Sequence, residues 1–308
     1  MRAITVSSWG SSPQFTSSHP DPSPSSADTV TLKILASGLH QLIRLQATGG
    51  HYTTKNTPTP YIPGADGVGE TPDGQRVYFN SIMTGGAFAE SITVPKANTT
   101  PLPEGTDPVT IAGLTNPGMS SWMAFAARID PPLPKGFTVV IVGVTAISAK
   151  VAVQFARVKG AGKIIGVARN AKEMAAIADL DERIVLANDP GQTDFSSLTD
   201  VDLILDYLYG PAVAALFAQL KSTVPTQFVQ IGTVAGNDMA LPGDILRSKN
   251  ITLRGTGPGS WAMSQYAKEL PGLLAAVAQL PDMDLKVRKL EEAEAAWAAK
   301  KERTVFVP

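Results

Sequence analysis

Length, composition and charge exclude several classes of protein. The chain has 308 residues with 26 Lys and Arg against 27 Asp and Glu, a formal net charge of −1, which predicts small-molecule partners rather than nucleic acid or a membrane surface. It contains no cysteine, which excludes disulfides, thiolate nucleophiles and zinc sites built on sulfur. No apolar run approaches the roughly 20 residues that span a bilayer, and the first residues lack the apolar stretch of a signal peptide. We therefore expect a cytoplasmic protein, and the length predicts two domains.

Residues 1–115 have the character of a small β domain. Proline is frequent, and short runs with β propensity, such as QRVYF at 75–79 and SITVP at 91–95, are bounded by turn residues. A Ser/Pro-rich stretch at 17–29 is expected to be an exposed loop. The region is predicted to be an irregular all-β domain.

From residue 138 onward, apolar runs alternate with amphipathic segments. The candidate strands are 138–144, 163–168, 183–188, 201–208, 227–233 and 251–257, and the candidate helices are 148–160, 171–180, 211–222 and 244–249. Parallel neighbours need crossover connections, and both sheet faces must then be covered. The alternation therefore predicts an α/β fold, a doubly wound Rossmann domain with a six-stranded parallel sheet.

The C-terminal tail has a different order of elements. After residue 260 we expect a long helix to Leu280, a strand at 285–290, a helix at 291–302 and a final apolar run at 304–308. No internal repeat is visible.

The first strand of the alternating half runs into a helix through Gly143, Thr145, Ala146 and Ile147, followed by Ala149. A dinucleotide-binding fold holds its pyrophosphate at this place, on the helix N-terminal N–H groups. The pattern G-x-x-x-x-x-A is a degraded form of the glycine fingerprint, because Ala146 occupies a position where glycine lets the backbone approach phosphate. A simple strand–helix turn remains the alternative.

The second strand is followed by Arg169, with Lys172 nearby. An NAD-binding fold has an acidic side chain in this region for the ribose hydroxyls, whereas a guanidinium suits the 2′-phosphate of NADPH. These two residues are predicted to select NADPH. The alternative is that Arg169 and Lys172 are ordinary surface residues at the exposed start of a helix.

Several stretches together resemble the zinc-independent branch of the medium-chain dehydrogenase/reductase superfamily, close to quinone oxidoreductases and enoyl reductases. They are ASGLHQLIR at 36–44, PYIPGADGVG at 60–69, GGAFAESITVP at 85–95, NPGMSSWMAF at 116–125, the strand–turn–helix from 138, VDLILDYLYGP at 201–211 and the C-terminal segment from 290. The resemblance implies a GroES-like catalytic domain at 1–115 and 260–308, and an NADPH-binding Rossmann domain at 116–259. It also implies NADPH in a cleft between the domains, and homodimers joined through edge strands of the nucleotide domains.

The same resemblance bears on metal binding. Zinc-dependent relatives have a Cys at the position of His40, a His at that of Ala65 and a Cys or His near Pro117, and two of these three residues cannot bind metal. Asp66 matches the acidic neighbour of the lost His, but one imidazole and one carboxylate make a poor tetrahedral site. No metal is expected, so hydrogen bonds would have to polarise the substrate carbonyl.

Two residues are candidates for catalysis. Tyr52 resembles the pocket-lining tyrosine of quinone reductases, although its spacing from Ile43-Arg44 is about two residues longer, and its hydroxyl could donate to a developing enolate oxygen. His40 is expected to face the cleft, where it could hydrogen-bond the nicotinamide ribose or the substrate. A surface tyrosine and a structural histidine are the respective alternatives.

Further candidate cofactor contacts come from the domain junction and from the later strand ends. Asn116, Ser120 and Ser121 lie where relatives touch the nicotinamide side of the cofactor, although the serines could instead cap a helix. Tyr207, Gly232 and Thr233 lie at the carboxyl edge of the predicted sheet, where open α/β sheets bind ligands. Tyr207 could instead pack in a domain interface.

These residues leave three functions open. The first is an NADPH-dependent reductase of an activated double bond, an enone or a quinone, with hydride transferred from the nicotinamide. The second is a non-redox isomerase or cyclase, suggested by Ala146 and Ala149 in the glycine turn. The third is a nucleotide-binding sensor without turnover.

Overall fold

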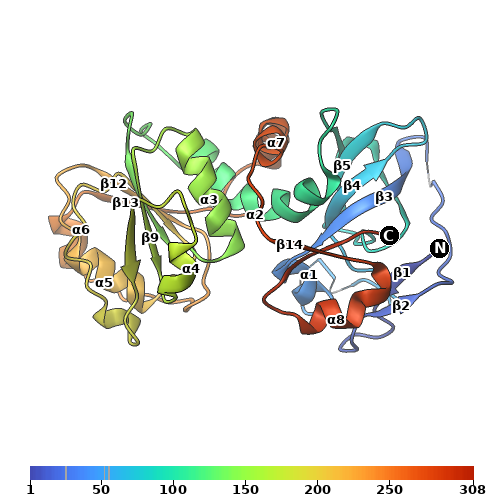
Figure 1. Ribbon diagram of the computed structural model, residues 1–308, viewed down its shortest axis with the longest axis horizontal. Helices are drawn as coiled ribbons and strands as arrows, with labels where there is room; N and C mark the ends of the chain where they lie inside the picture. Colours follow the sequence, from blue (N-terminus) through green and yellow to red (C-terminus); the bar gives the residue numbers. More distant parts are fainter. Residues whose placement is uncertain (25, 52, 55) are drawn as a thin grey trace. The chain divides into compact units, whose positions relative to one another are not determined.

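The computed structural model describes every residue of the chain except 25, 52 and 55 and divides it into two compact units (Figure 1). The first unit contains Met1–Asn116 and Leu270–Pro308, and the second contains Pro117–Glu269. The sequence predicted the second junction at residue 260. The second unit extends further because residues 260–269 are hydrogen-bonded to it, as when Arg128 donates to the carbonyl of Ser260 (3.0 Å).

The first unit is built on a seven-stranded sheet in the order β14-β15-β3-β4-β5-β7, with β6 paired to β3 and a separate β1–β2 hairpin. The β14–β15 pair is parallel and the other pairs are antiparallel. Its elements are β1 (Ala3–Thr5), β2 (Gln14–Thr16), β3 (Thr29–Leu39), α1 (Gln41–Gln46), β4 (Asp66–Glu70), β5 (Arg76–Asn80), β6 (Ser91–Pro95), η1 (Lys96–Asn98), β7 (Thr99–Pro101), β14 (Leu285–Arg288), η3 (Leu290–Glu292), α8 (Ala293–Ala298) and β15 (Arg303–Phe306).

The C-terminal segment completes this sheet. Strand β15 pairs with β3, with Thr304 opposite Leu39 and Phe306 opposite Ser37. The side chain of Phe306 is buried in a cluster with Ile4 and Leu39. The two ends of the chain therefore share one core, and the expected strand and helix of the tail are present in shortened form.

A long helix that was not predicted from the sequence, α2 (Pro108–Ala127), leads from the first unit into the second. Pro117 lies inside it and has no N–H for the carbonyl of Gly113, four residues earlier. Arg303 of β15 supplies the missing donor, because its Nε donates to that carbonyl at 2.8 Å. A tertiary contact thus lets the helix continue where a proline would be expected to break it.

The second unit contains a six-stranded, all-parallel sheet in the order β10-β9-β8-β11-β12-β13, which confirms the predicted doubly wound fold (Figure 1). The strand order reverses between β8 and β11. Its elements are β8 (Thr138–Val142), α3 (Ile147–Val158), β9 (Lys163–Ala168), α4 (Ala171–Ala175), β10 (Glu182–Val185), η2 (Pro190–Gln192), β11 (Leu203–Asp206), α5 (Pro211–Gln219), β12 (Thr226–Gln230), α6 (Gly243–Ser248) and β13 (Ile251–Gly255). Helix α7 (Met263–Val277) begins in this unit and ends in the first.

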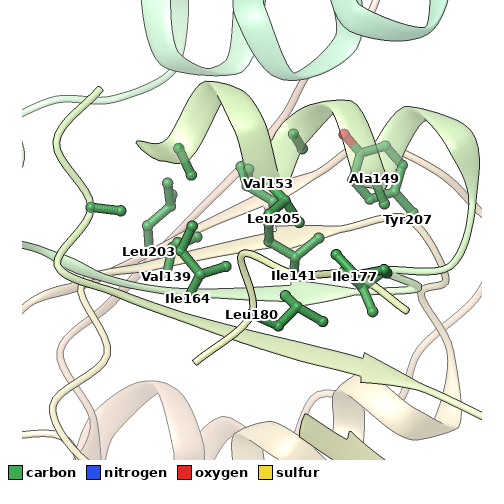
Figure 2. Close-up of a cluster of buried hydrophobic side chains, with 14 of the residues drawn as sticks. Val139, Ile141, Ala149, Val153, Ile164, Ile177, Leu180, Leu203, Leu205 and Tyr207 are labelled. Carbon is green, nitrogen blue, oxygen red and sulfur yellow. The ribbon is translucent and has the colours of Figure 1, made fainter. Parts of the chain in front are cut away.

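Both faces of the parallel sheet are covered, as the apolar runs predict. Val139 and Ile141 of β8 pack with Ala149 and Val153 of α3 on one face (Figure 2). Their neighbours in the strand, Val140 and Val142, are buried on the other face in a cluster with residues of α5 and α6. Alternate residues of each strand therefore fill two separate cores, and the strand ends are left to form turns.

Among the described residues, no helix is long and apolar enough to cross a membrane.

Candidate functional site

The turn after β8 has the conformation that a glycine allows. Gly143 has φ +87°, and its N–H donates to the carbonyl of Val167 at 2.8 Å. A Cβ at Gly143 would lie 3.1 Å from the side chain of Leu208. Both the left-handed backbone and the lack of space therefore favour glycine here.

Helix α3 begins after this turn without a side-chain cap. Its N-cap residue, Ala146, is exposed and has an extended backbone (φ −67°, ψ 145°), and Thr145 and Ile147 are half-buried on either side. The first N–H groups of this 12-residue helix therefore have no side-chain cap to satisfy them, at the positive end of the helix dipole. Such an end binds anions, and the conformation of Ala146 is open to any L-residue.

Two cations follow β9. Arg169 and Lys172 are exposed, and within the described residues neither side chain makes a hydrogen bond or an ion pair. The side chain of Asn170, which lies between them, accepts hydrogen bonds from the N–H groups of Lys172 and Glu173 and so caps α4. The geometry leaves the two cations available to an anionic ligand.

The turn after β11 is organised by Asp206, which is the last residue of that strand. Its carboxylate is fully buried and accepts from the N–H groups of Leu208 (2.9 Å) and Tyr209 (3.0 Å). Its peptide carbonyl accepts from the N–H groups of Ile231 (2.7 Å) and Gly232 (3.1 Å). Burial raises the pKa of the Asp206 carboxyl to about 6, against the opposing effect of the two backbone donors.

Asp206 holds a turn with an unusual backbone. Tyr209 (φ +62°) and Gly210 (φ +74°) are both left-handed, and a non-glycine residue rarely adopts that conformation. The hydrogen bonds from the turn to Asp206 stabilise it. The signal in the sequence is an acidic residue that ends the otherwise apolar run LIL, at the carboxyl edge of the sheet.

The structure places Tyr207 inside the second unit. Its side chain is 6% exposed and lies in the cluster between the sheet and α3 (Figure 2). Its hydroxyl donates to the carbonyl of Ser148 at 3.3 Å and lies 3.4 Å from the hydroxyl of Ser120. Burial raises the pKa of the phenol to about 12. Tyr207 therefore ties the first turn of α3 to α2, and its contact with a cofactor stays a prediction.

Gly232 and Thr233 lie in the turn after β12. A Cβ at Gly232 would lie 2.6 Å from the carbonyl oxygen of Tyr207, so the turns after β11 and β12 approach each other too closely for a side chain between them. Thr233 is exposed and lines a pocket of about 360 Å³ together with Tyr209 and Gln230. Four predicted turns, after β8, β9, β11 and β12, thus lie at one edge of the parallel sheet.

His40 belongs to the first unit and lies in a buried polar cluster. Its Nε2 is 3.1 Å from Oδ1 of Asp66, whose Oδ2 accepts from the hydroxyl of Tyr78 at 2.8 Å. The other imidazole nitrogen, Nδ1, is buried and has no partner among the described residues. Burial lowers the pKa of His40, and Asp66 opposes that effect. The imidazole is therefore neutral near pH 7, with one nitrogen left unpaired.

Arg303 lies beside this cluster. Its Nη1 donates to the carbonyl of Leu39 at 3.3 Å, and its Nη2 is buried without a partner among the described residues. Burial lowers the pKa of Arg303 to about 10, and the Asp66 carboxylate opposes that effect. The first unit thus contains a buried carboxylate, a buried guanidinium and a neutral imidazole around the start of β4.

The remaining predicted residues lie in or near α2. Asn116 is the last residue of the first unit before α2 enters the second. Ser120 donates to the carbonyl of Pro117 (2.9 Å) and Ser121 to that of Gly118 (3.3 Å), so each serine hydroxyl bonds within its own helix. Tyr52, the predicted proton donor, lies outside the described residues.

Comparison with known proteins identifies the family. No family model matches the chain. It is 32% identical, over the full length of both proteins, to a probable NADPH-dependent quinone reductase, tdiC, of Emericella nidulans. The chain belongs to the quinone oxidoreductases of the medium-chain dehydrogenase/reductase superfamily. The family resemblance and the fold class predicted from the sequence are thereby confirmed.

Solved quinone oxidoreductases share this fold. One from Thermus thermophilus, whose structures include a complex with NADPH, has a TM-score of 0.80 at 23% identity, with 100% of each chain covered. One from Pseudomonas syringae has a TM-score of 0.78 at 16% identity, covering 100% of this chain and 99% of its own.

The described residues of this quinone oxidoreductase contain no group of three or more His, Cys, Asp or Glu side chains that could hold a metal ion. His40 and Asp66 lie together, but the other two ligand positions of the zinc-dependent relatives hold Ala65, which is buried, and Pro117, and neither side chain can bind a metal.

Proposed function

We propose that this quinone oxidoreductase is an NADPH-dependent, zinc-independent reductase of a quinone, an enone or another activated double bond. The observation that carries the proposal is the carboxyl edge of the parallel sheet. An uncapped helix N-terminus after β8 and two unpaired cations after β9, among the residues that the structure describes, lie at the place where a doubly wound fold binds the phosphates of a dinucleotide.

The residues at this edge fit NADPH. The N-terminal N–H groups of α3 would bind the pyrophosphate, and the turn that leads to them keeps glycine at 143, where a Cβ would press on the side chain of Leu208. Arg169 and Lys172 would bind the 2′-phosphate, since a guanidinium and an ammonium suit a dianion. Gly232 and Thr233 would contact the nicotinamide half. Bound NADPH would supply a hydride, while the protein orients both reactants and excludes water.

Ala146 does not argue against this assignment. Its backbone conformation requires no glycine, and its exposed methyl group leaves the N–H groups of α3 uncapped. The isomerase or cyclase alternative was motivated by this residue and by Ala149, which is buried against the sheet as a helix–strand contact requires. Neither alanine closes the phosphate site.

A reductase without zinc needs hydrogen bonds to polarise the substrate carbonyl. His40 is not such a donor, because its neutral imidazole donates from Nε2 to the Asp66 carboxylate and keeps Nδ1, buried and without a partner among the described residues, as an acceptor. That nitrogen could accept a hydrogen bond from a hydroxyl group of the nicotinamide ribose. Tyr52 and Ser120 remain candidates for such a donor.

We also infer that the protein forms homodimers through β13. This strand ends the six-stranded sheet, so its outer N–H and carbonyl groups have no neighbouring strand in the described part of the chain. Leu253 in β13 is 37% exposed and Leu246 in the preceding helix is 49% exposed. A second copy would pair with the edge and cover both side chains. Light scattering should give twice the chain mass, and Leu253→Lys should shift the protein toward monomer.

Two measurements test the proposed function. Fluorescence or calorimetric titration should show NADPH binding, and NADPH oxidation should follow the addition of a substrate from a panel of quinones and enones. Binding without turnover on any member of the panel would favour the non-redox or sensor functions. A protein that binds no NADPH would refute the assignment of the carboxyl edge.

A further inference from the structure

Asp206 is a buried anion without a cation. Its side chain is 0% exposed, and its hydrogen bonds come from the backbone N–H groups of Leu208 and Tyr209. Its neighbours in the adjacent strands are Val142 of β8 and Gln230 of β12, both uncharged. Among the described residues no Lys, Arg or His side chain pairs with this carboxylate.

The titratable groups around Asp206 do not neutralise it. In its own turn Tyr207 and Tyr209 contribute phenols, which carry no positive charge at any pH, and Leu208 contributes no titratable group. The strands on either side contribute no titratable side chain at this level, and the turn that follows β12 begins with Ile231 and Gly232. Such a carboxylate is costly to ionise unless a positive charge comes close by.

The position of Asp206 indicates where that charge comes from. The strand order reverses between β8 and β11, and a dinucleotide crosses an open parallel sheet at this point. Arg169 and Lys172, which follow β9, would bind the adenosine half of the dinucleotide. The nicotinamide half would then lie at the ends of β11 and β12, and Asp206 is the last residue of β11. This step rests on the proposed NADPH site.

We propose that Asp206 is a positioning residue with an electrostatic role, whose buried carboxylate favours the positively charged nicotinamide of NADP⁺ over the neutral ring of NADPH. The two cofactor forms carry the same phosphates and differ by a hydride and hence by the charge of the ring. A fixed negative charge in a buried site acts strongly on that difference. The carboxylate would thereby lower the reduction potential of the bound cofactor and make it a better hydride donor.

The test is the ratio of the two dissociation constants, Kd for NADPH divided by Kd for NADP⁺, measured by calorimetry without substrate. At pH 8 the Asp206→Asn variant should show a ratio about tenfold lower than the wild type, the effect of an interaction worth one pKa unit. Asn keeps an oxygen for the two backbone donors, so the turn can keep its form. The cofactor's 2′-phosphate titrates in both forms, so its contribution cancels in the ratio.

Asp202 is the matched control. It lies just before the same strand, at the opposite end, where its carboxylate accepts from the N–H of Thr138 at 2.8 Å. Asp202→Asn removes one negative charge and should leave the ratio unchanged. A tenfold fall in both variants would show that the effect is one of net charge and would overturn the role of Asp206.

A second measurement needs no variant. In the wild type, lowering the pH from 8 to about 5.5 protonates most of Asp206, so the ratio should fall severalfold toward that of the Asn variant. If the wild type binds both forms and its ratio changes neither with pH nor with Asp206→Asn, this proposal is refuted and the proposed function stands. If the wild type binds neither form, the proposed cofactor site itself fails.

Discussion

The burial of Asp206 has a consequence for stability that can be measured without any ligand. Burial raises the pKa of this carboxyl from 3.8 to about 6. Because the folded state disfavours the ionised form, the cost to stability is fully present above pH 6 and disappears as the pH falls through 6 toward 3.8. The pKa difference of 6 − 3.8 = 2.2 corresponds to about 3 kcal/mol at neutral pH.

The perturbation is Asp206→Asn, which removes the charge and keeps an acceptor for Leu208 and Tyr209. The variant also brings an amide NH₂ without a partner, but that contribution does not depend on pH. From the two pKa values, the wild type should bear a cost of about 3 kcal/mol at pH 7.5 and about 1.6 kcal/mol at pH 5. The stability of the variant relative to the wild type should therefore be about 1.4 kcal/mol more favourable at pH 7.5 than at pH 5.

Urea unfolding of both proteins at the two pH values measures this difference, with tryptophan fluorescence and far-UV circular dichroism as probes of the transition. Asp202→Asn serves again as the control, because its carboxylate is only half-buried. A difference between Asp206→Asn and the wild type that stays constant from pH 5 to pH 7.5 would refute the reasoning, since the carboxylate would then titrate alike in both states.

The carboxyl edge and the zinc-independent site can be tested by further changes. Arg169→Ala should weaken NADPH binding by roughly ten- to a hundredfold and leave NADH binding nearly unchanged, and equal losses for both cofactors would contradict the 2′-phosphate assignment. Gly232→Ala places a methyl 2.6 Å from the carbonyl of Tyr207 and should cost about 1–3 kcal/mol and weaken NADPH binding, whereas Gly257→Ala meets nothing within 4 Å and should do neither. Activity should survive prolonged dialysis against a chelator, and stoichiometric zinc retained by the purified protein would overturn the zinc-independent assignment.

The parallel sheet could be predicted from the sequence because its physical signal is local. The four inner strands, β9, β8, β11 and β12, are short apolar runs buried on both faces, and amphipathic segments lie between the strands. The edge strands β10 and β13 contain no buried residue. The six expected strands are all present, in an order that the alternation alone does not fix. The predicted helix at 171–180 was too long, since α4 ends at Ala175, and residues such as Ile177 and Leu180 enter the core from a turn instead.

Other features could not be predicted because they depend on contacts between distant residues. Helix α2 continues through Pro117 because Arg303, far away in sequence, bonds the carbonyl that the proline leaves without its helical donor. Tyr207 directly follows β11 at the predicted carboxyl edge of the sheet, and its hydroxyl reaches Ser148 and Ser120 in two neighbouring helices. Side-chain direction at a strand end depends on such partners, which no periodicity reveals.

Asp206 shows why the residues that organise a site differ from those that line it. Its side chain is fully buried, yet it stabilises the left-handed turn at Tyr209, and its peptide carbonyl binds the turn that begins at Ile231 and Gly232. A neutral side chain could make the same hydrogen bonds without the cost of burying a charge. An uncompensated carboxylate at this position therefore implies a benefit that arises only when a positive charge binds nearby, and the nicotinamide of the oxidised cofactor carries such a charge.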